Sequence, residues 1–440
     1  MQDDHPWLRH LETLHHQAID LNLERIQKVG EKGGLFDLDC KVVLVAGTNG
    51  KGTTVFALEK LLTQSGLSVG CYTSPHLVSF NERIQINGKL ITDQALIEAF
   101  EVVEALRDNV PLTFFEFTTL AAFHFFKVNS PDILLAEIGL GGRLDAVNCL
   151  TPDLSIITSI GYDHQSWLGT TLEEIAAEKA GILRKNTPCV IGKDAQLPCL
   201  VEIADSLNCS SDIGGINFDW VTPVSKTETD DEWRYHNQQY TVPEHHLPAN
   251  SVSIALASYI RLTELLKLPA IEKLVDGLHH ASMRGRFYTV SQSPEIIVDV
   301  AHNIDSCRLL KERLMRHVKT GRRFALWAML NDKDINNTAH LFRDIFDAWY
   351  VPVIHSERAY TQDRLVESLE MSGIYKIFRV TSTKLAYEEL LKKMNRTDQM
   401  VVFGSFYTVS EFLKYFEQAA DVSKTELEKQ SIIGDFYAKN

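Results

Sequence analysis

Apolar runs alternate with amphipathic stretches along most of this chain of 440 residues. Residues 42–46 form an uninterrupted aliphatic run, which is typical of a strand buried on both faces of a parallel sheet. Further apolar runs at residues 68–74, 132–137 and 154–160 are separated by stretches with helical periodicity. Strands that alternate with helices in this way predict an α/β fold built on parallel sheets.

Helices are predicted where apolar residues recur every three or four positions. Such segments cover most of residues 1–40 and the stretches 93–107, 113–128 and 250–266. Residues 186–248 have weaker periodicity and contain a polar run, so we expect a loop or hairpin there at the edge of the first domain. We expect the polar tail after residue 421 to be partly disordered.

A second alternating pattern occupies the C-terminal third of the chain. It predicts another doubly wound sheet, because helical segments separate five short apolar runs. These runs lie at residues 296–300, 324–329, 349–354, 377–380 and 400–404. Ligands of such sheets bind at the carboxyl ends of the strands. The residues that follow the first and last runs, His302 and Ser405, are therefore candidate site residues.

A glycine-rich turn over residues 47–53 follows the first apolar run. Glycines let backbone N–H groups converge on an anion, and the helix predicted to begin near Thr53 adds partial positive charge at its N-terminus. Lys51 supplies a full positive charge. A strict Walker A motif would have glycine and serine or threonine where this chain has Val45 and Gly52. The turn is therefore a phosphate-binding loop of variant form.

The phosphate loop and the two strand patterns together predict the fold class. We expect an α/β protein with an N-terminal P-loop ATPase domain and a smaller C-terminal Rossmann-like α/β domain. The expected boundaries are residues 1–285 for the first domain, 286–295 for a linker and 296–440 for the second domain.

Polar side chains at the ends of three other apolar runs are candidate metal ligands: Ser74, Glu137 and His164. A carboxylate at a strand end beside a phosphate loop is where NTPases hold Mg²⁺. His164 is the histidine best placed to bind a metal, although its position alone also fits a structural role. The glycine-rich segment 139–145 lacks the spacing of a dinucleotide-binding fingerprint, so we reject that interpretation.

Lys179 lies on the apolar face of a predicted helix, seven residues beyond Leu172 and four beyond Ile175. A lysine that points inward is desolvated, which lowers its pKa and favours the neutral amine. A neutral amine can react with CO₂ to form an anionic carbamate. In the alternative interpretation, which spacing alone favours, the side chain extends outward to solvent or pairs with a neighbouring glutamate.

Composition narrows the choice of partners. A formal charge of −14 argues against a nucleic-acid-binding surface. No apolar run approaches the roughly 20 residues that span a bilayer, so we expect no membrane partner. The seven cysteines form no C-x-x-C pair, and no signal peptide is evident. We therefore expect reduced thiols and a cytoplasmic location.

Seven motifs occur in the order in which they occur in one family, at residues 47–53, 72–77, 137–145, 163–164, 178–182, 285–286 and 299–303. The chain resembles the folylpolyglutamate synthases, in particular the bacterial bifunctional dihydrofolate synthase/folylpolyglutamate synthases. The resemblance runs from about the first helix to residues 404–405. Gly52 within the phosphate loop distinguishes this family from the related cell-wall Mur ligases.

This resemblance implies an ATP-dependent ligase with a Mur-ligase-like ATP-binding domain and a C-terminal glutamate-ligase domain. In such enzymes ATP phosphorylates a substrate carboxylate, and the amine of L-glutamate then displaces phosphate from the acyl phosphate. The implied substrates are dihydropteroate, which becomes dihydrofolate, and folates whose glutamate tail is extended. The resemblance implies ATP and two Mg²⁺ ions as cofactors and leaves room for K⁺. We expect a monomer.

The resemblance also implies residue roles. The catalytic residues would be Lys51, Lys179 and His164, with Lys179 matching a carbamylated lysine of the family. Ser74 and Glu137 would bind one Mg²⁺ and His164 a second. The nucleotide contacts would be Thr48, Asn49, Gly50, Lys51, Gly52, Thr53, Asn250, Arg286 and Asp299. The pterin pocket would be lined by Asp20, Leu21, Thr113, Phe115, Leu144, Asp145 and Ala146. The incoming glutamate would contact His302 and Ser405.

Two other functions remain open at this point. The first is a monofunctional folylpolyglutamate synthase, although residues 113–116 resemble the enzymes that carry both activities. The second belongs to a different class, a P-loop switch or regulatory nucleotide binder without ligase activity. The chain lacks the Asn-Lys-x-Asp motif that reads guanine, since residues 331–334 are Asn-Asp-Lys-Asp.

Overall fold

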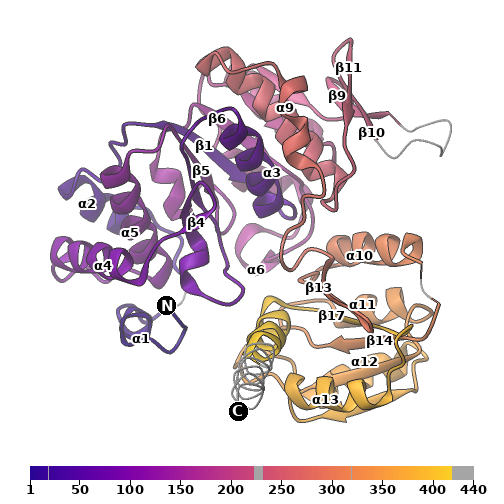
Figure 1. The fold of residues 1–440 in the computed structure, drawn as a ribbon. Helices are drawn as coiled ribbons and strands as arrows, with labels where there is room; N and C mark the ends of the chain where they lie inside the picture. The colour runs from indigo at the N-terminus through magenta and orange to yellow at the C-terminus, as the bar shows by residue number, and fades with distance from the viewer. Residues whose placement is uncertain (18, 222–230, 319, 419–440) are drawn as a thin grey trace, which may run out of the picture. The chain divides into compact units, whose positions relative to one another are not determined.

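The computed structural model describes residues 1–17, 19–221, 231–318 and 320–418 (Figure 1). These residues form two compact units, of which the first is Met1–Met283 and the second begins at Arg284. Most of the polar run at residues 226–232 and the tail after residue 421 lie outside the described residues. Each unit is built on its own sheet.

The first unit contains an eight-stranded sheet in the order β4-β3-β2-β5-β1-β6-β7-β8. Its strands from β2 to β8 in that order run parallel, whereas β3 and β4 form an antiparallel edge. The bounds are β1 Lys41–Ala46, β2 Val69–Tyr72, β3 Ile84–Ile86, β4 Lys89–Leu90, β5 Ile133–Glu137, β6 Leu154–Ile157, β7 Cys189–Ile191 and β8 Ser211–Ile213.

Helices cover both faces of this sheet (Figure 1). On one face lie α1 (Pro6–Thr13), α2 (Glu24–Lys32), α4 (Asp93–Arg107), α5 (Phe114–Asn129), α7 (Leu172–Ala180) and α8 (Pro198–Ser206). On the other lie α3 (Lys51–Gln64) and α9 (Ala249–Leu266). The short helix α6 (Gln165–Leu168) precedes α7. Short 3₁₀ turns are η1 Phe80–Arg83, η2 Ala146–Cys149, η3 Lys193–Ala195, η4 Ile271–Lys273 and η5 Val275–Leu278.

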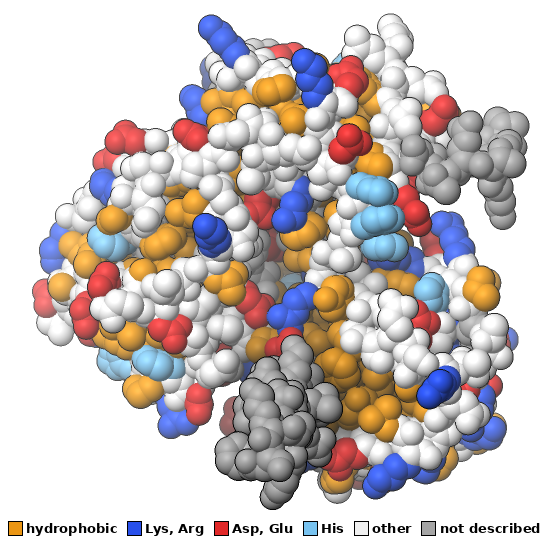
Figure 2. Space-filling model, in the orientation of Figure 1, with side chains coloured by type: hydrophobic (Ala, Val, Ile, Leu, Met, Phe, Trp, Pro, Cys, Tyr) orange, Lys and Arg blue, Asp and Glu red, His pale blue; other side chains and the backbone are white. Residues whose placement is uncertain are grey.

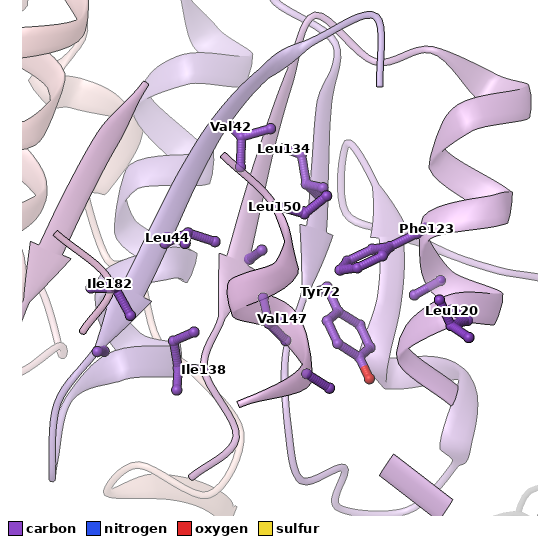
Figure 3. Packing of buried hydrophobic residues seen from close by; sticks show 14 of the residues in the cluster. Val42, Leu44, Tyr72, Leu120, Phe123, Leu134, Ile138, Val147, Leu150 and Ile182 are labelled. Carbon is purple, nitrogen blue, oxygen red and sulfur yellow. The ribbon is translucent and has the colours of Figure 1, made fainter. Parts of the chain in front are cut away.

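The core of the first unit follows the two-residue period of its central strand. Val42 and Leu44 pack with Phe123 and Leu134 on the side of α5, as Figure 3 shows. Val43 and its alternate neighbours face α3 and α9 instead. Because successive side chains of a strand point to opposite faces, one continuous apolar run fills two cores.

Residues 186–248 contain more regular structure than the sequence predicted. Besides β7, α8 and β8, they form a three-stranded antiparallel sheet of β9 (Phe218–Val221), β10 (Asp231–Tyr235) and β11 (Gln238–Val242). This small sheet packs on α9 through the buried Trp233, whose Nε1 donates a hydrogen bond to Ser253 Oγ at 2.7 Å. The expected hairpin is therefore part of this three-stranded sheet.

The second unit contains a six-stranded sheet in the order β12-β13-β17-β14-β15-β16. Its strands are β12 Tyr288–Gln292, β13 Glu295–Asp299, β14 Arg323–Trp327, β15 Ala348–Pro352, β16 Ile377–Val380 and β17 Gln399–Phe403. The five strands after β12 are mutually parallel. Its helices are α10 Ile304–Arg316, α11 Ile335–Phe342, α12 Gln362–Met371 and α13 Thr383–Lys393, followed by a helix at residues 406–418.

The expected linker at residues 286–295 is not a linker in this structure. Half of it is strand β12, which pairs antiparallel with β13 and belongs to the second sheet. Its sequence, Tyr-Thr-Val-Ser-Gln, has few apolar residues because β12 is a half-buried edge strand. An edge strand of this kind produces little hydrophobic signal in the sequence.

No helix among the described residues is long and apolar enough to cross a membrane. Acidic and basic side chains intermix over the face shown in Figure 2. The described cysteines are free thiols, as the sequence predicted.

Candidate functional site

The predicted phosphate loop connects β1 to α3 and is fastened to the end of β6. The N–H of Thr48 donates to the Ser159 carbonyl at 2.9 Å, and the N–H of Asn49 donates to the Ser159 hydroxyl at 2.8 Å. Thr158 Oγ1 donates to the Asn49 carbonyl at 2.7 Å. Because these two amides are used by Ser159, the amides available to a phosphate group are those at the start of α3.

Gly47 permits the close contact between the phosphate loop and β6. Its φ is 150°, and a Cβ at this position would lie 1.9 Å from Thr158 Oγ1. Any larger residue would push the loop away from the strand. Gly50, with φ 86°, then turns the chain into α3.

Two lysine side chains converge on the carbonyl oxygen of Gly47. Nζ of Lys51 lies 3.1 Å from this oxygen, and Nζ of Lys179 lies 3.0 Å from it. Lys179 is only 3% exposed, which excludes the outward-pointing alternative. Burial and the charge of Lys51 lower the pKa of Lys179 to about 7, against the opposing attraction of two nearby carboxylates. Near pH 7 a substantial fraction of this amine is therefore neutral.

Helix α7 holds Lys179 in place through contacts with the loop that follows β5. A capping box formed by Thr171 and Glu174 begins this helix. A Cβ at Gly142 would lie 2.8 Å from the Glu178 carbonyl oxygen, so the loop and the helix touch backbone to backbone. The Arg143 guanidinium also pairs with the Glu178 carboxylate at 2.7 Å. The position of Lys179 thus depends on the conformation of this loop.

Two of the three predicted metal ligands lie together beside the phosphate loop. The N–H of Ser74 donates to Glu137 Oε2 at 3.1 Å, which brings the ends of β2 and β5 together. A Cβ at Gly52 would lie 3.4 Å from the same oxygen, so the start of α3 approaches this carboxylate closely. A carboxylate beside a hydroxyl suits a hard divalent cation such as Mg²⁺ or Mn²⁺.

His164 follows β6 and directly precedes α6, in the left-handed backbone conformation with φ 50°. Its imidazole is one-third exposed, and Nε2 lies 3.9 Å from Asp163 Oδ1. Asp163 also influences the pKa of Lys179, which places it near that amine. The His164 imidazole and the adjacent Asp163 carboxylate fit a second cation site by their chemistry.

The predicted pterin residues of α5 lie at its first turn. Thr113 is the N-cap, and Glu116 completes a capping box with it: the N–H of Thr113 donates to Glu116 Oε2 at 2.7 Å. The Phe115 ring stacks on Tyr72 with ring centres 6.3 Å apart. A Cβ at Gly139 would lie 2.5 Å from Phe115 Cζ, so only glycine fits beneath the ring. The Phe115 ring is half-buried and oriented by its neighbours.

Asp145 organises the loop in which the structure places Leu144 and Ala146. Its Oδ2 accepts from the N–H of Leu140 at 2.8 Å, and its Oδ1 accepts from the N–H of Val147 at 2.9 Å. Burial raises the pKa of Asp145 to about 6, although these hydrogen bonds oppose the shift. Both carboxylate oxygens of Asp145 thus accept hydrogen bonds from the backbone of its own loop, a role that the sequence did not predict.

Asp20 and Leu21 lie in the segment between α1 and α2, and both are half-buried. Asp20 is bound by Arg25 at the start of α2, and the same guanidinium also binds Glu116 of α5. The structure thus links Asp20 to the first turn of α5, two parts of the predicted pterin site that lie far apart in the sequence.

Asn250 lies in the first turn of α9, next to the phosphate loop. A Cβ at Gly50 would lie 3.0 Å from Oγ of Ser251, the residue after Asn250. Asn250 Nδ2 donates to Asp194 Oδ2 at 2.7 Å. A pocket of about 300 Å³ is lined by Asn250, Asp194 and Trp220, among others.

In the second unit the four predicted residues lie at or near the carboxyl ends of β13 and β17. Asp299 is buried, and its oxygens accept from the N–H groups of Phe287 and Ala301, both at 2.8 Å. The guanidinium carbon of Arg286 lies 5.3 Å from the centre of the Phe406 ring. Burial raises the pKa of Asp299, and the charge of Arg286 opposes this.

His302 and Ser405 differ in their accessibility. His302 is half-buried, and its Nδ1 donates a hydrogen bond to the Val300 carbonyl at 2.9 Å. Ser405 is 2% exposed. Its hydroxyl lies 2.7 Å from Thr408 Oγ1 and accepts from the Thr408 N–H, so it caps the helix at residues 406–418.

Sequence reasoning missed several residues that hold this site together. Ser159 and Thr158 fasten the predicted phosphate loop, and Arg25 connects two parts of the predicted pterin site. The hydroxyls of residues 158 and 159 at the end of an apolar strand were a detectable signal. Arg25 had none, because its partner Glu116 is 91 positions away.

The second unit matches a known family of domains. Residues 285–406 match the family described as "Mur ligase, glutamate ligase domain". The Escherichia coli dihydrofolate synthase/folylpolyglutamate synthase is 34% identical over 418 residues, which cover 93% of this chain and 95% of that protein. The protein of the same name from Haemophilus influenzae is 35% identical over 430 residues, covering 92% and 96%.

Solved structures give the same result. The chain aligns with E. coli FolC in complex with DHPP and ADP at a TM-score of 0.88 and 34% identity, covering 96% of this chain and 100% of that one. It also aligns with a bifunctional folylpolyglutamate synthase/dihydrofolate synthase with Mn, AMPPNP and L-glutamate bound, at a TM-score of 0.85 and 34% identity, covering 95% and 99%.

The lowered pKa of Lys179 makes a testable prediction about stability. The unfolded chain holds this proton up to the ordinary pKa of 10.5, whereas the folded protein releases it at about 7. The protonated buried amine therefore destabilises the fold most below pH 7, and the effect declines as the pH rises toward 10.5. Lys179→Met is expected to raise the free energy of unfolding at pH 6 by on the order of 3 kcal/mol, and by clearly less at pH 9.5.

Urea denaturation of the ligand-free full chain at both pH values measures this difference. Lys273→Met, at an exposed lysine of the same unit, is the matched control and should show no such pH dependence. An equal effect of Lys179→Met at pH 6 and pH 9.5 would contradict the prediction.

Proposed function

The chain belongs to the dihydrofolate synthase/folylpolyglutamate synthase family, and on this premise we propose how its residues carry out the reaction. It is an ATP-dependent ligase that adds L-glutamate to dihydropteroate, forming dihydrofolate, and to the glutamate tail of folates. In our proposal both reactions pass through an acyl phosphate. The carboxylate oxygen of the acceptor attacks the γ-phosphorus of ATP, and the bond from that phosphorus to the β-phosphate oxygen breaks.

In the second half of the reaction the amine nitrogen of L-glutamate attacks the acyl carbon. The carbon–oxygen bond to the phosphate breaks, and phosphate leaves with one oxygen that came from the acceptor carboxylate. The amine loses a proton as the amide forms. The same two steps serve both acceptors, because each presents a free carboxylate.

The observation that carries this proposal is the convergence of Lys51 and Lys179 on the Gly47 carbonyl, beside the Glu137 carboxylate. A carboxylate that attacks ATP brings negative charges together, so the reaction needs positive charge at the phosphoryl group. Lys51 and the amides at the start of α3 would hold the β- and γ-phosphates. We assign Thr48 and Asn49 to the shape of the loop, because their N–H groups donate to Ser159.

We extend the proposal to the metals. Ser74 and Glu137 would hold one Mg²⁺, and His164 would contribute to a second. When bound, the divalent cations offset the charge that develops on the transferring phosphoryl group. We assign no residues to the K⁺ ion for which the family resemblance leaves room.

We also propose that the neutral amine of Lys179 is carbamylated in the active protein. The nitrogen attacks CO₂, a nitrogen–carbon bond forms, and one proton leaves the nitrogen, so the neutral amine becomes an anionic carbamate. Its lowered pKa near 7 supplies the neutral nucleophile that this addition needs. An anion at this position would help to hold a divalent cation beside Lys51.

The remaining roles follow the two units. In the first unit we assign Asp20, Leu21, Thr113, Phe115, Leu144 and Ala146 to the pterin, with Asp145 shaping its loop. Asn250 in the first unit and Arg286 and Asp299 in the second are proposed nucleotide contacts. His302 is a proposed glutamate contact, and Ser405 supports it by capping the following helix. We propose that the protein acts as a monomer in the cytoplasm.

A phosphate-release assay with two acceptors tests the function. Purified protein with ATP and L-glutamate is expected to release phosphate both with dihydropteroate and with tetrahydrofolate. Release that depends on tetrahydrofolate alone would instead support a monofunctional folylpolyglutamate synthase. Nucleotide binding without release in the presence of either acceptor would contradict the ligase function.

Chemical rescue tests the role of Lys179. Lys179→Ala removes the attachment point of the carbamate and is expected to lower kcat by at least about 100-fold. Acetate or another short carboxylic acid should restore part of this activity, because it can place an anion in the vacated space. Lys51→Ala is the comparison, since the loss of a cation should not be rescued by an acid. Equal activity of Lys179→Ala with and without the acid would argue against the carbamate.

A further inference from the structure

A single guanidinium group joins two parts of the proposed pterin site. Arg25 Nη1 donates to Asp20 Oδ2 at 2.8 Å, and Nη2 donates to the Asp20 carbonyl at 3.1 Å. On its other side, Nε lies 3.3 Å from Glu116 Oε2 and Nη2 lies 3.2 Å from Oε1. Asp20 comes from the segment between α1 and α2, whereas Glu116 belongs to the first turn of α5.

The partners of Arg25 are also the residues that shape the proposed site. Glu116 closes the capping box of α5 by accepting from the N–H of Thr113, and Phe115 lies between these two residues. Asp20 is itself a proposed pterin contact. Arg25 therefore connects the acid at one edge of the site to the turn that presents the aromatic ring.

Arg25 ties the segment that carries Asp20 to helix α2, and His15 Nε2 also lies 3.6 Å from Asp20 Oδ2. The described residues 14–17 and 19–23 form no helix or strand, whereas Arg25 stands on α2, which packs into the core through Ile26 and Val29. Arg25 is 17% exposed and Glu116 is 5% exposed, so their pairing is largely shielded from solvent. A shielded, forked pair of this kind restricts geometry far more than an exposed ion pair does.

The arrangement leaves part of Asp20 available to a ligand. Arg25 binds Oδ2, and among the described residues Oδ1 has no hydrogen-bond partner. The Asp20 side chain is 29% exposed. A pterin presents adjacent N–H donors on its pyrimidine ring, which a fixed carboxylate can accept.

We propose that Arg25 is a positioning residue for pterin recognition, which holds Asp20 in register with the Thr113–Phe115 turn so that both contact the same ring. This inference rests on the proposed function, because it uses the pterin roles of Asp20 and Phe115. Arginine is required since its planar fork binds two carboxylates at once, whereas the lysine ammonium offers a single point of charge.

Arg25→Lys tests this role because it keeps the positive charge beside Glu116 and loses the fork. The KM for dihydropteroate is expected to rise roughly 10-fold, since a displacement of about 1 Å in a positioned group has large kinetic effects. The KM for ATP and the thermal midpoint should stay near their wild-type values. Arg25→Met, which leaves Glu116 without its cation, should raise the KM for dihydropteroate further than Arg25→Lys does. It should again leave the KM for ATP near its wild-type value.

The matched control is Arg107→Lys. Arg107 is 13% exposed and pairs with the single carboxylate of Glu104 within α4. Its Nη1 also lies 3.4 Å from the Val110 carbonyl, so it is as shielded as Arg25 but joins no two carboxylates. Its substitution should leave the KM for dihydropteroate unchanged. Equal effects of Arg25→Lys on the KM values for dihydropteroate and ATP, or none on the former, would overturn the inference.

A double-mutant cycle identifies the route by which Arg25 acts. Asp20→Asn should itself raise the KM for dihydropteroate, and adding Arg25→Lys should then change it by less than about twofold. Independent, multiplying effects would show that Arg25 does not act through Asp20. If wild-type protein releases no phosphate with dihydropteroate, the proposed function and this inference both fail. If wild-type protein and Asp20→Asn behave as expected but Arg25→Lys resembles wild type, only the inference fails.

Discussion

The close contact between the phosphate loop and the end of β6 is the constraint on which the site depends. Gly47 has no room for a side chain against Thr158, and Ser159 takes the amides of Thr48 and Asn49. The loop is therefore fixed before any anion binds. This arrangement directs the Gly47 carbonyl toward Lys51 and Lys179, and it leaves the first amides of α3 available for phosphate.

The electrostatics of the site follow from this geometry. Two ammonium groups that share one carbonyl cannot both remain charged easily when one of them is buried. Lys179 accordingly has the lowered pKa, and Lys51 contributes to lowering it. In our proposal, Lys51 binds phosphate and the neutral fraction of Lys179 reacts with CO₂. Glu137 lies at the adjacent strand end, where a divalent cation would complete the charge balance.

The elements with strong local signals were predictable from the sequence. The α4 helix spans Asp93–Arg107 as expected, because its threonine cap and apolar spacing are local features. Strand β12 was mistaken for a linker, since a half-buried edge strand needs few apolar residues. Helical periodicity left both an inward and an outward orientation of Lys179 open. The packing of α7 against Gly142 decides for the inward one. Spacing could not reveal that Ser405 caps a helix or that Arg25 joins Asp20 to Glu116, because these depend on tertiary contacts.

The central claim, that the substrate carboxylate is phosphorylated by ATP before glutamate attacks, predicts the fate of one oxygen atom. Dihydropteroate labelled with ¹⁸O in its carboxylate, incubated with the protein, ATP and L-glutamate, is the most direct test. The released phosphate should carry one ¹⁸O atom per turnover, which ³¹P NMR detects as an isotope shift. Phosphate free of label, formed together with dihydrofolate, would contradict the acyl-phosphate mechanism.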